Sequence, residues 1–146
     1  MNWQIVSIER LKSYEARRQA LQLIPEQLKT LEMSFEAIRA ATIDAVPVHG
    51  GGGNKREEAL IDNIVRREEL ERNLKIAEQE VKITEEGLSG LTEEQQRILE
   101  MFYIDRPRGH VERLCEELFL EKSRVYALKD EALKKFTVAC YGIVEI

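Results

Sequence analysis

The feature that most constrains this chain is a pair of apolar stripes, each repeating at alternating steps of three and four residues. The first consists of Leu21, Ile24, Leu28, Leu31, Phe35 and Ile38, and the second of Leu70, Leu74, Ala77, Val81, Thr84 and Leu88. This spacing places apolar side chains along one side of an α-helix. Two such helices must bury their stripes against each other or against a second copy of the chain. Stripes of about three heptads do not decide between a hairpin and a coiled-coil dimer.

A clear break separates the two stripes. Residues 42–53, TIDAVPVHGGGG, contain Pro47 and end in four consecutive glycines, which is typical of a linker. Asn54, with Glu57 three residues later, can cap the helix that follows. Within the first stripe, Pro25 suits the first position of a helix, so we expect two helices that meet near Ile24 and not one continuous helix.

Residues 91–136 predict three short helices with a tight turn before the last. Thr92 can cap the first helix, and Gln95 can bond back to complete a capping box. We expect the second helix at 110–118 and the third from about 123 to 136 or slightly beyond. The expected buried faces are Ile98, Leu99, Phe102 and Tyr103, then Val111, Leu114, Cys115 and Leu118, then Val125, Leu128, Ala132, Leu133 and Phe136. This outline is that of a helix-turn-helix unit, whose last helix enters the DNA major groove.

The predicted fold is therefore all-α, with a long helical hairpin or coiled-coil arm followed by a three-helix helix-turn-helix domain. Its expected parts are the N-terminal helices at 1–41, the linker at 42–53, a long charged helix at 54–90 and the helix-turn-helix domain at 91–146. Gly87 and Gly90 mark an expected hinge between the long helix and that domain.

Residues 110–136, HVERLCEELFLEKSRVYALKDEALKKF, resemble the second half of region 4 of the sigma-70 factors, which reads the promoter −35 element. The match needs no gap, and residues 131–136 are similar to the basic, leucine-containing ending of that family. Cys115 stands where the family has a small residue between the two helices. The wider arrangement, over roughly residues 10–137, resembles phage late-gene regulators of the RinA and ArpU type. The chain lacks the aromatic and basic helix with which complete sigma factors melt promoters.

The resemblance implies a sequence-specific DNA-binding transcription regulator of phage or prophage origin, acting in the cytoplasm of a bacterial host with helix 122–136 in the major groove. It places the base-reading positions at Lys122, Ser123, Tyr126 and Ala127. Tyr126 and Ala127 depart from the arginine and glutamine that sigma factors typically carry. The expected phosphate-contacting residues are Arg124, Lys129 and Arg113, since phosphate contacts position a protein without specifying sequence. Arg106 and Arg108, just upstream, complete the expected set of DNA-binding residues.

The net charge of −5 counts against a non-specific coating of nucleic acid. The local balance differs, because residues 122–135 hold five basic and two acidic side chains. Glu116, Glu117 and Glu121 lie close to the expected DNA-facing side and would weaken binding. A basic site within an acidic chain suits a protein that binds at chosen sequences.

Other functions find little support in the sequence. Gly50–Gly53 followed by Lys55 and Arg56 does not match a phosphate-binding P-loop. His49 and His110 have no metal-ligand spacing, and Cys115 and Cys140 stand alone, as reduced cysteines do in a cytosolic protein. We therefore expect no enzyme, no cofactor and no metal. No segment has the apolar length of a membrane span, and the N-terminus lacks the pattern of a signal peptide.

The expected partners are double-stranded DNA and a second copy of the chain, with a dimer favoured and RNA polymerase as a further candidate. A different class of function also fits the arrangement. In a small terminase-like packaging or assembly protein, the helical arm would build a ring. Oligomeric state separates the two hypotheses, because a dimer favours the regulator and a ring of many subunits favours the packaging protein.

Overall fold

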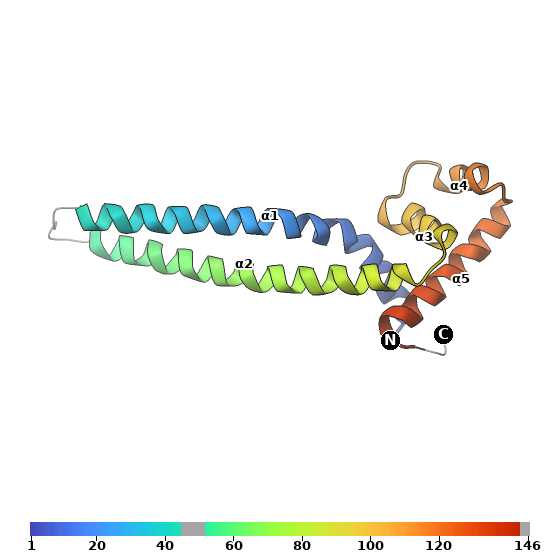
Figure 1. The fold of residues 1–146 in the computed structure, drawn as a ribbon, viewed down its shortest axis with the longest axis horizontal. Helices are drawn as coiled ribbons and strands as arrows, with labels where there is room; N and C mark the ends of the chain where they lie inside the picture. Colours follow the sequence, from blue (N-terminus) through green and yellow to red (C-terminus); the bar gives the residue numbers. More distant parts are fainter. Residues whose placement is uncertain (45–51, 144–146) are drawn as a thin grey trace. The chain divides into compact units, whose positions relative to one another are not determined.

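The computed structural model describes residues 1–44 and 52–143, and all regular structure in those ranges is helical (Figure 1). The predicted all-α class is confirmed. The elements are α1 (Trp3–Asp44), α2 (Gly52–Ser89), α3 (Glu93–Leu99), the π-helical η1 (Glu100–Ile104), α4 (His110–Leu118) and α5 (Lys122–Tyr141). The centre of the predicted linker, including Pro47 and His49, lies outside the described residues. Because α2 begins at Gly52, the predicted cap at Asn54 lies inside this helix and not before it.

The contacts divide the chain into two units, and both long helices contribute to each. The unit called the head comprises Met1–Arg18 and Gln79–Ile146, and the unit called the arm comprises Gln19–Glu78. The N-terminal 18 residues therefore pack with the helix-turn-helix region, although some 70 residues separate the two segments in sequence.

In the arm, α1 and α2 run side by side in opposite directions (Figure 1). Their predicted stripes meet within one chain along a line called the seam, where Ile24, Leu70 and Ala77 are buried. The hairpin, one of the two alternatives for these stripes, is thus the arrangement within the chain. It removes apolar surface from water without a second copy.

The seam also contains a polar interlock that the apolar pattern did not predict. Asn63 is 6 % exposed, and its side-chain nitrogen donates to the backbone oxygen of Leu31 at 2.8 Å. Arg67 donates from Nε to Asn63 Oδ1 at 2.9 Å, and its guanidinium lies 4.9 Å from the centre of the Phe35 ring. A buried asparagine bonded to one particular carbonyl fixes the register of two helices, because a shifted register would leave it unpaired.

Arg67 also belongs to the seam although it is charged, whereas the apolar Ile61 and Val65 of the same helix are more than half exposed. One expectation for the long helices was wrong. Pro25 lies inside a continuous α1, so no helix boundary occurs near Ile24. A proline removes only one backbone hydrogen bond, and Ile24 in the seam holds the helix against its partner at this point.

Most of the predicted helix-turn-helix core is confirmed in the head, where Ile98, Phe102, Val111, Leu114, Val125 and Leu128 are buried together. Met101, which was not predicted, joins them, and the predicted Tyr103, Cys115 and Leu118 are partly buried against this cluster. The capping box of Thr92 and Gln95 is present, and α4 has the predicted bounds. The π-helical turn of η1 was not predicted. The backbone amide of Asp105, just after this turn, donates to the backbone oxygen of Glu100 at 2.8 Å, and both Met101 and Phe102 are buried in the core.

A second core in the head joins α5 to the N-terminal segment. It consists of Leu11, Leu91, Leu99, Ala132, Leu133 and Phe136. Leu11 is fully buried, and Ser7 shares a 2.8 Å hydrogen bond with Thr137. Trp3 stacks on Tyr141 with ring centres 5.0 Å apart, and α5 accordingly continues five residues beyond Phe136. Residues from the start of the chain therefore complete the hydrophobic core around the three short helices.

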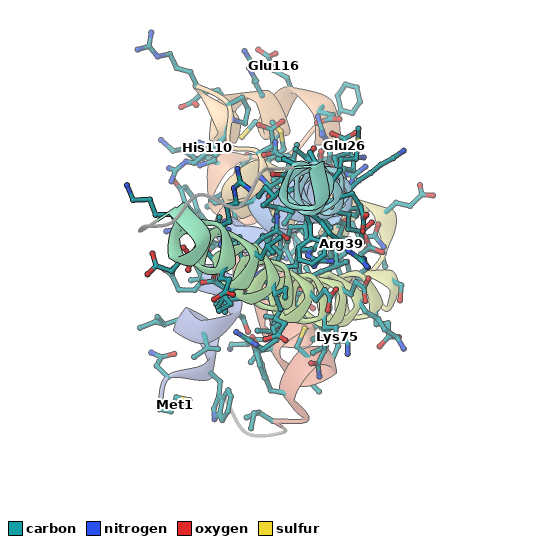
Figure 2. The ribbon with its side chains drawn as sticks, turned by 90° about the vertical axis from the view of Figure 1, so that its left-hand side faces the viewer. Met1, Glu26, Arg39, Lys75, His110 and Glu116 are labelled. Atoms are coloured by element: carbon teal, nitrogen blue, oxygen red, sulfur yellow. The ribbon has the colours of Figure 1, made fainter. Side chains whose placement is uncertain are left out.

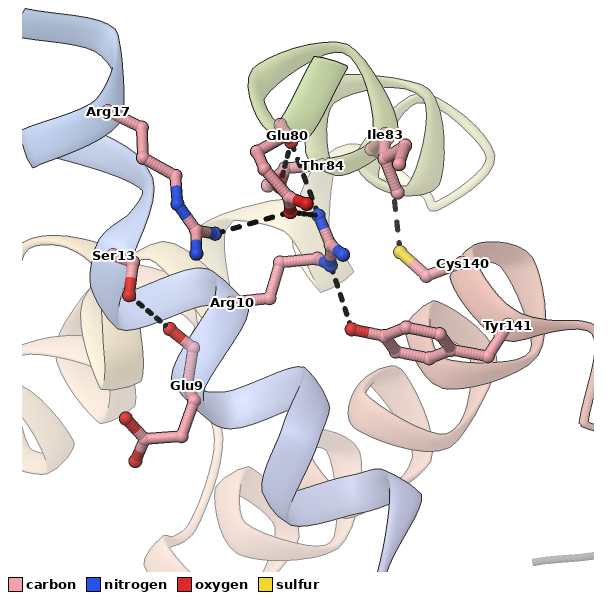
Figure 3. A network of polar contacts seen from close by, with 9 residues as sticks. All are labelled: Glu9, Arg10, Ser13, Arg17, Glu80, Ile83, Thr84, Cys140 and Tyr141. Carbon is pink, nitrogen blue, oxygen red and sulfur yellow. Dashed lines mark hydrogen bonds and ion pairs between the residues drawn. The ribbon is translucent and has the colours of Figure 1, made fainter. Parts of the chain in front are cut away.

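A polar network in the head joins α1, α2 and α5 (Figure 3). Arg10 of α1 forms an ion pair with Glu80 of α2 and donates from Nε to the hydroxyl of Tyr141 on α5 at 2.8 Å. Arg17 reaches the same Glu80 carboxylate at 3.5 Å. Because the Arg10 side chain is only 11 % exposed, losing Glu80 would leave a buried charge without its partner.

The expected hinge at Gly87 is not supported by its surroundings. Gly87 lies within α2, and a Cβ atom placed there would come 2.6 Å from Cys140 Sγ and 2.9 Å from Phe136 Cε2. Glycine is needed here because α5 approaches the α2 backbone closely. Around Gly90, by contrast, the nearest atom to such a Cβ is the Gly87 oxygen at 3.9 Å.

Candidate nucleic-acid interface

The turn between α4 and α5 is short and has a well-defined backbone. Gly109 precedes α4 with φ +69°, a left-handed conformation that favours glycine. Phe119 ends α4 with φ 57°, and the amide of Leu120 donates to the oxygen of Cys115 at 3.1 Å. This closure resembles the common glycine-terminated helix ending, with phenylalanine in the glycine position. Glu121 then leads directly into α5.

The start of α5 presents the predicted base-reading residues to solvent. Lys122, Ser123, Arg124, Tyr126 and Ala127 are all exposed. Val125 and Leu128 point inward and are buried in the core, so they fix the rotation of the helix. Lys122 and Arg124 form no ion pair within the described residues, which leaves both charges available to a polyanion.

Tyr126 is held in position by a group of rings. Its ring centre lies 5.8 Å from that of Phe102 at an interplanar angle of 71°, and Phe102 in turn meets the His110 ring edge-on at 4.7 Å. Tyr126 is nevertheless 41 % exposed. A large side chain that is both fixed and exposed loses little conformational entropy when it binds.

Lys129 has a different environment from the other predicted phosphate contacts. Its ammonium lies 2.6 Å from Asp130 Oδ1 and 5.9 Å from the ring centre of Tyr126, and the side chain is 19 % exposed. Burial alone would lower the pKa of Lys129, but the hydrogen bond to Asp130 and the neighbouring Tyr103 hydroxyl raise it overall. A DNA phosphate would have to compete with Asp130 for this ammonium.

The three upstream arginines lie around the start of α4, and all are exposed. Arg106 donates from Nε to Nδ1 of the buried His110 at 3.3 Å. Burial and the adjacent Arg106 charge lower the pKa of His110, so the imidazole is neutral at pH 7. Arg108 and Arg113 have no ion pair within the described part of the chain.

The acidic residues near this surface are not all free to repel DNA. Glu117 accepts from Arg97 Nε at 3.1 and 3.2 Å, an ion pair that links α4 to α3. Figure 2 shows Glu116 projecting from α4 away from the other helices of the head. Glu121 is exposed at the start of α5 and remains an unfavourable charge beside Lys122.

Phe119 was predicted only as part of the turn, yet it is 93 % exposed and has a positive φ. A non-glycine residue in this backbone region is disfavoured, and the exposed ring gains nothing from packing. The position of an aromatic residue where glycine or asparagine usually stands is the only sequence signal of this feature.

Within the described residues, no group of three histidine, cysteine, aspartate or glutamate side chains is placed to hold a metal ion. None of the described helices has the combination of length and apolar character needed to cross a membrane.

A family model described as "Protein of unknown function (DUF1492)" matches residues 37–137 of the chain. The match covers more than half of the 146 residues, and the chain belongs to this family. It includes the whole of α2, α3, η1 and α4, and α5 as far as Thr137. No curated protein and no solved structure matches the chain.

Proposed function

We propose that this member of the DUF1492 family is a sequence-specific regulator of transcription that places the first turns of α5 in the major groove of double-stranded DNA. The observation that carries the proposal is the set of exposed, unpaired basic and polar side chains at the start of a helix that follows a short turn. The family is phage-associated, which supports a phage or prophage origin.

The exposed side chains divide into two groups by their reach. Lys122, Ser123 and Tyr126 lie in the first two turns of α5, where base edges are within reach of a helix in the groove. The second group has exposed charges farther from the expected base edges and suits phosphate contacts, which orient the protein without reading sequence; it consists of Arg124, Arg113 and Arg108. Arg106 joins this second group while it also holds His110.

RNA polymerase is the second partner that we propose, and Phe119 is the contact residue. Its ring is almost fully exposed beside α4, and Glu116 and Glu121 on either side disfavour a DNA contact there. An apolar ring among carboxylates suits a protein pocket with a basic rim. A regulator that binds DNA beside a promoter can act by such a contact without melting the duplex.

The test is selection of bound fragments from sheared phage and host DNA, followed by sequencing. The proposal expects enrichment of a shared site by the wild type and loss of that enrichment in Lys122→Ala with Tyr126→Ala. Each good base contact contributes roughly 1–3 kcal/mol of discrimination.

Lys75→Ala is the matched control, because Lys75 is an exposed lysine of the arm (Figure 2). This variant should enrich the same site as the wild type. Absence of any enriched site for the wild type, or an unchanged site in the double variant, would contradict the proposal.

A further inference from the structure

The face of α2 opposite the seam carries a second regular row of side chains. The row consists of Val65, Glu69, Arg72 and Ile76, at steps of four, three and four residues. Each member stands two positions after a seam residue (Asn63, Arg67, Leu70 and Leu74), and two positions turn an α-helix by about 200°. Val65 is 54 % exposed and Ile76 is 58 % exposed, and Ile61, one turn before Val65, is 58 % exposed.

No described residue covers this row. The seam stripe cannot serve a second copy without opening the hairpin, because Leu70 and Ala77 are already buried against α1. Figure 2 shows Lys75, the neighbour of Ile76, on the side of α2 that faces away from α1. Any partner of the arm that leaves the hairpin intact can therefore use the outer row.

The order of the row makes it complementary to itself. It runs apolar, acidic, basic, apolar, so a reversed copy presents Ile76 to Val65 and Arg72 to Glu69. We propose that the outer row of α2 pairs with the same row of a second copy in antiparallel orientation. A two-fold axis between residues 70 and 71 then repeats every contact twice, as isologous dimers require.

The charges of the row favour this orientation over the parallel one. Arg72 has no ion pair within the described part of the chain. Glu69 is bound by Arg66 at 2.8 Å, but both side chains are about half exposed, and such pairs contribute little. A carboxylate accepts more than one donor, so Glu69 can also bind the partner's Arg72. In a parallel dimer, Glu69 of one chain would lie beside Glu69 of the other, and Arg72 beside Arg72, so that like charges would repel.

The row predicts a dimer of modest affinity. From Val65 to Ile76 it spans about 17 Å at 1.5 Å per residue, which is about three helical turns. Such a contact buries less than the roughly 800 Å² per partner of a typical stable interface. The dimer should therefore form and dissociate over a measurable concentration range, and its formation does not depend on DNA binding by the head.

The experiment is sedimentation of the full chain over a concentration series without DNA. The wild type should shift from monomer to dimer with rising concentration. Glu69→Arg alone and Arg72→Glu alone each bring like charges together twice and should raise the dissociation constant about ten-fold or more. The double variant Glu69→Arg with Arg72→Glu restores both attractive pairs and should dimerise as the wild type does.

Glu71→Arg is the matched control, since it makes the same charge change two positions away on a different face of α2, and it should leave the dissociation constant unchanged. Val65→Lys with Ile76→Lys should abolish the dimer. The proposal is overturned if the wild type stays monomeric at the highest concentration reached or forms a ring of many subunits. It is also overturned if the double charge variant fails to recover dimerisation while keeping wild-type helicity.

Discussion

The head and the arm both bury apolar residues of the long helices, but they do so in different ways. The arm buries its stripe through a repeated local pattern, to which Asn63 and Arg67 add specific polar bonds. The head instead combines segments from the two ends of the chain, with Leu11, Glu80 and Tyr141 as meeting points. A repeated pattern tolerates single changes, whereas a joint between distant segments concentrates stability in a few side chains.

The largest expected difference between the two units comes from removing one buried side chain of α1 in each. Leu11→Ala should destabilise the protein by roughly 3–5 kcal/mol, because Leu11 is fully buried in the closed core of the head. Ile24→Ala in the arm should cost less, roughly 2–3 kcal/mol, since the hairpin can relax around the lost volume. Urea unfolding followed by circular dichroism measures both, with the exposed Met33→Ala as control. An equal cost at Leu11 and Met33 would show that the N-terminal segment does not complete the head.

A gain in stability is expected at Pro25. Replacing it by alanine should stabilise the arm by up to about 3 kcal/mol, because the missing backbone hydrogen bond is restored within a continuous helix. Thermal unfolding of Pro25→Ala against the wild type tests this. A lower melting temperature would mean that α1 is broken at this position.

The two glycines near the end of α2 should respond differently to alanine. Gly87→Ala should destabilise the head by about 1–3 kcal/mol, because the new methyl group would overlap the side chains of Cys140 and Phe136. Gly90→Ala should change stability little, since the added Cβ meets no side chain. If both changes are neutral, or both stabilise, Gly87 is not needed for the close approach of α5 and the hinge interpretation is favoured. Combining Gly87→Ala with Cys140→Ala should recover part of the loss.

The smallest effect concerns pH and His110. Because burial and Arg106 lower the pKa of His110 in the folded head, the unfolded chain binds its proton first as the pH falls. The contribution of His110 is therefore present above pH of about 6.5 and is lost as the pH falls below it. The decline in stability between pH 7 and pH 5 should be shallower in His110→Gln than in the wild type. Identical slopes would show that His110 does not contribute to the pH dependence of stability.

The local patterns were sufficient to predict much of the head. The capping box at Thr92, the bounds of α4 and the buried faces of the three short helices all follow from signals a few residues long. The sequence could not show that Leu11 and Ser7 complete this core, because contacts between distant segments leave no spacing to recognise. The same reason explains Gly87, whose role depends on the approach of α5 and not on its own neighbours in sequence.

Misplaced expectations in the arm have a different origin. A charged residue such as Arg67 does not count in an apolar pattern, yet its long side chain lies over the Phe35 ring and binds Asn63. Pro25 suits the first position of a helix and so predicts a boundary, whereas α1 continues through it with the adjacent Ile24 buried in the seam. At the interface, exposure of Lys122 could be expected from helical periodicity, but the pairing of Lys129 with Asp130 depends on side-chain geometry.

The most direct test of the account is the salt dependence of binding to a selected duplex and to a random duplex. For Lys122→Ala, the account predicts lost preference for the selected duplex, because a base contact is removed. For Arg113→Ala, it predicts weaker binding to both duplexes and a salt slope lower by about one, because a phosphate contact is removed. Equal losses on both duplexes for both variants would contradict the assignment of α5 as the reading helix.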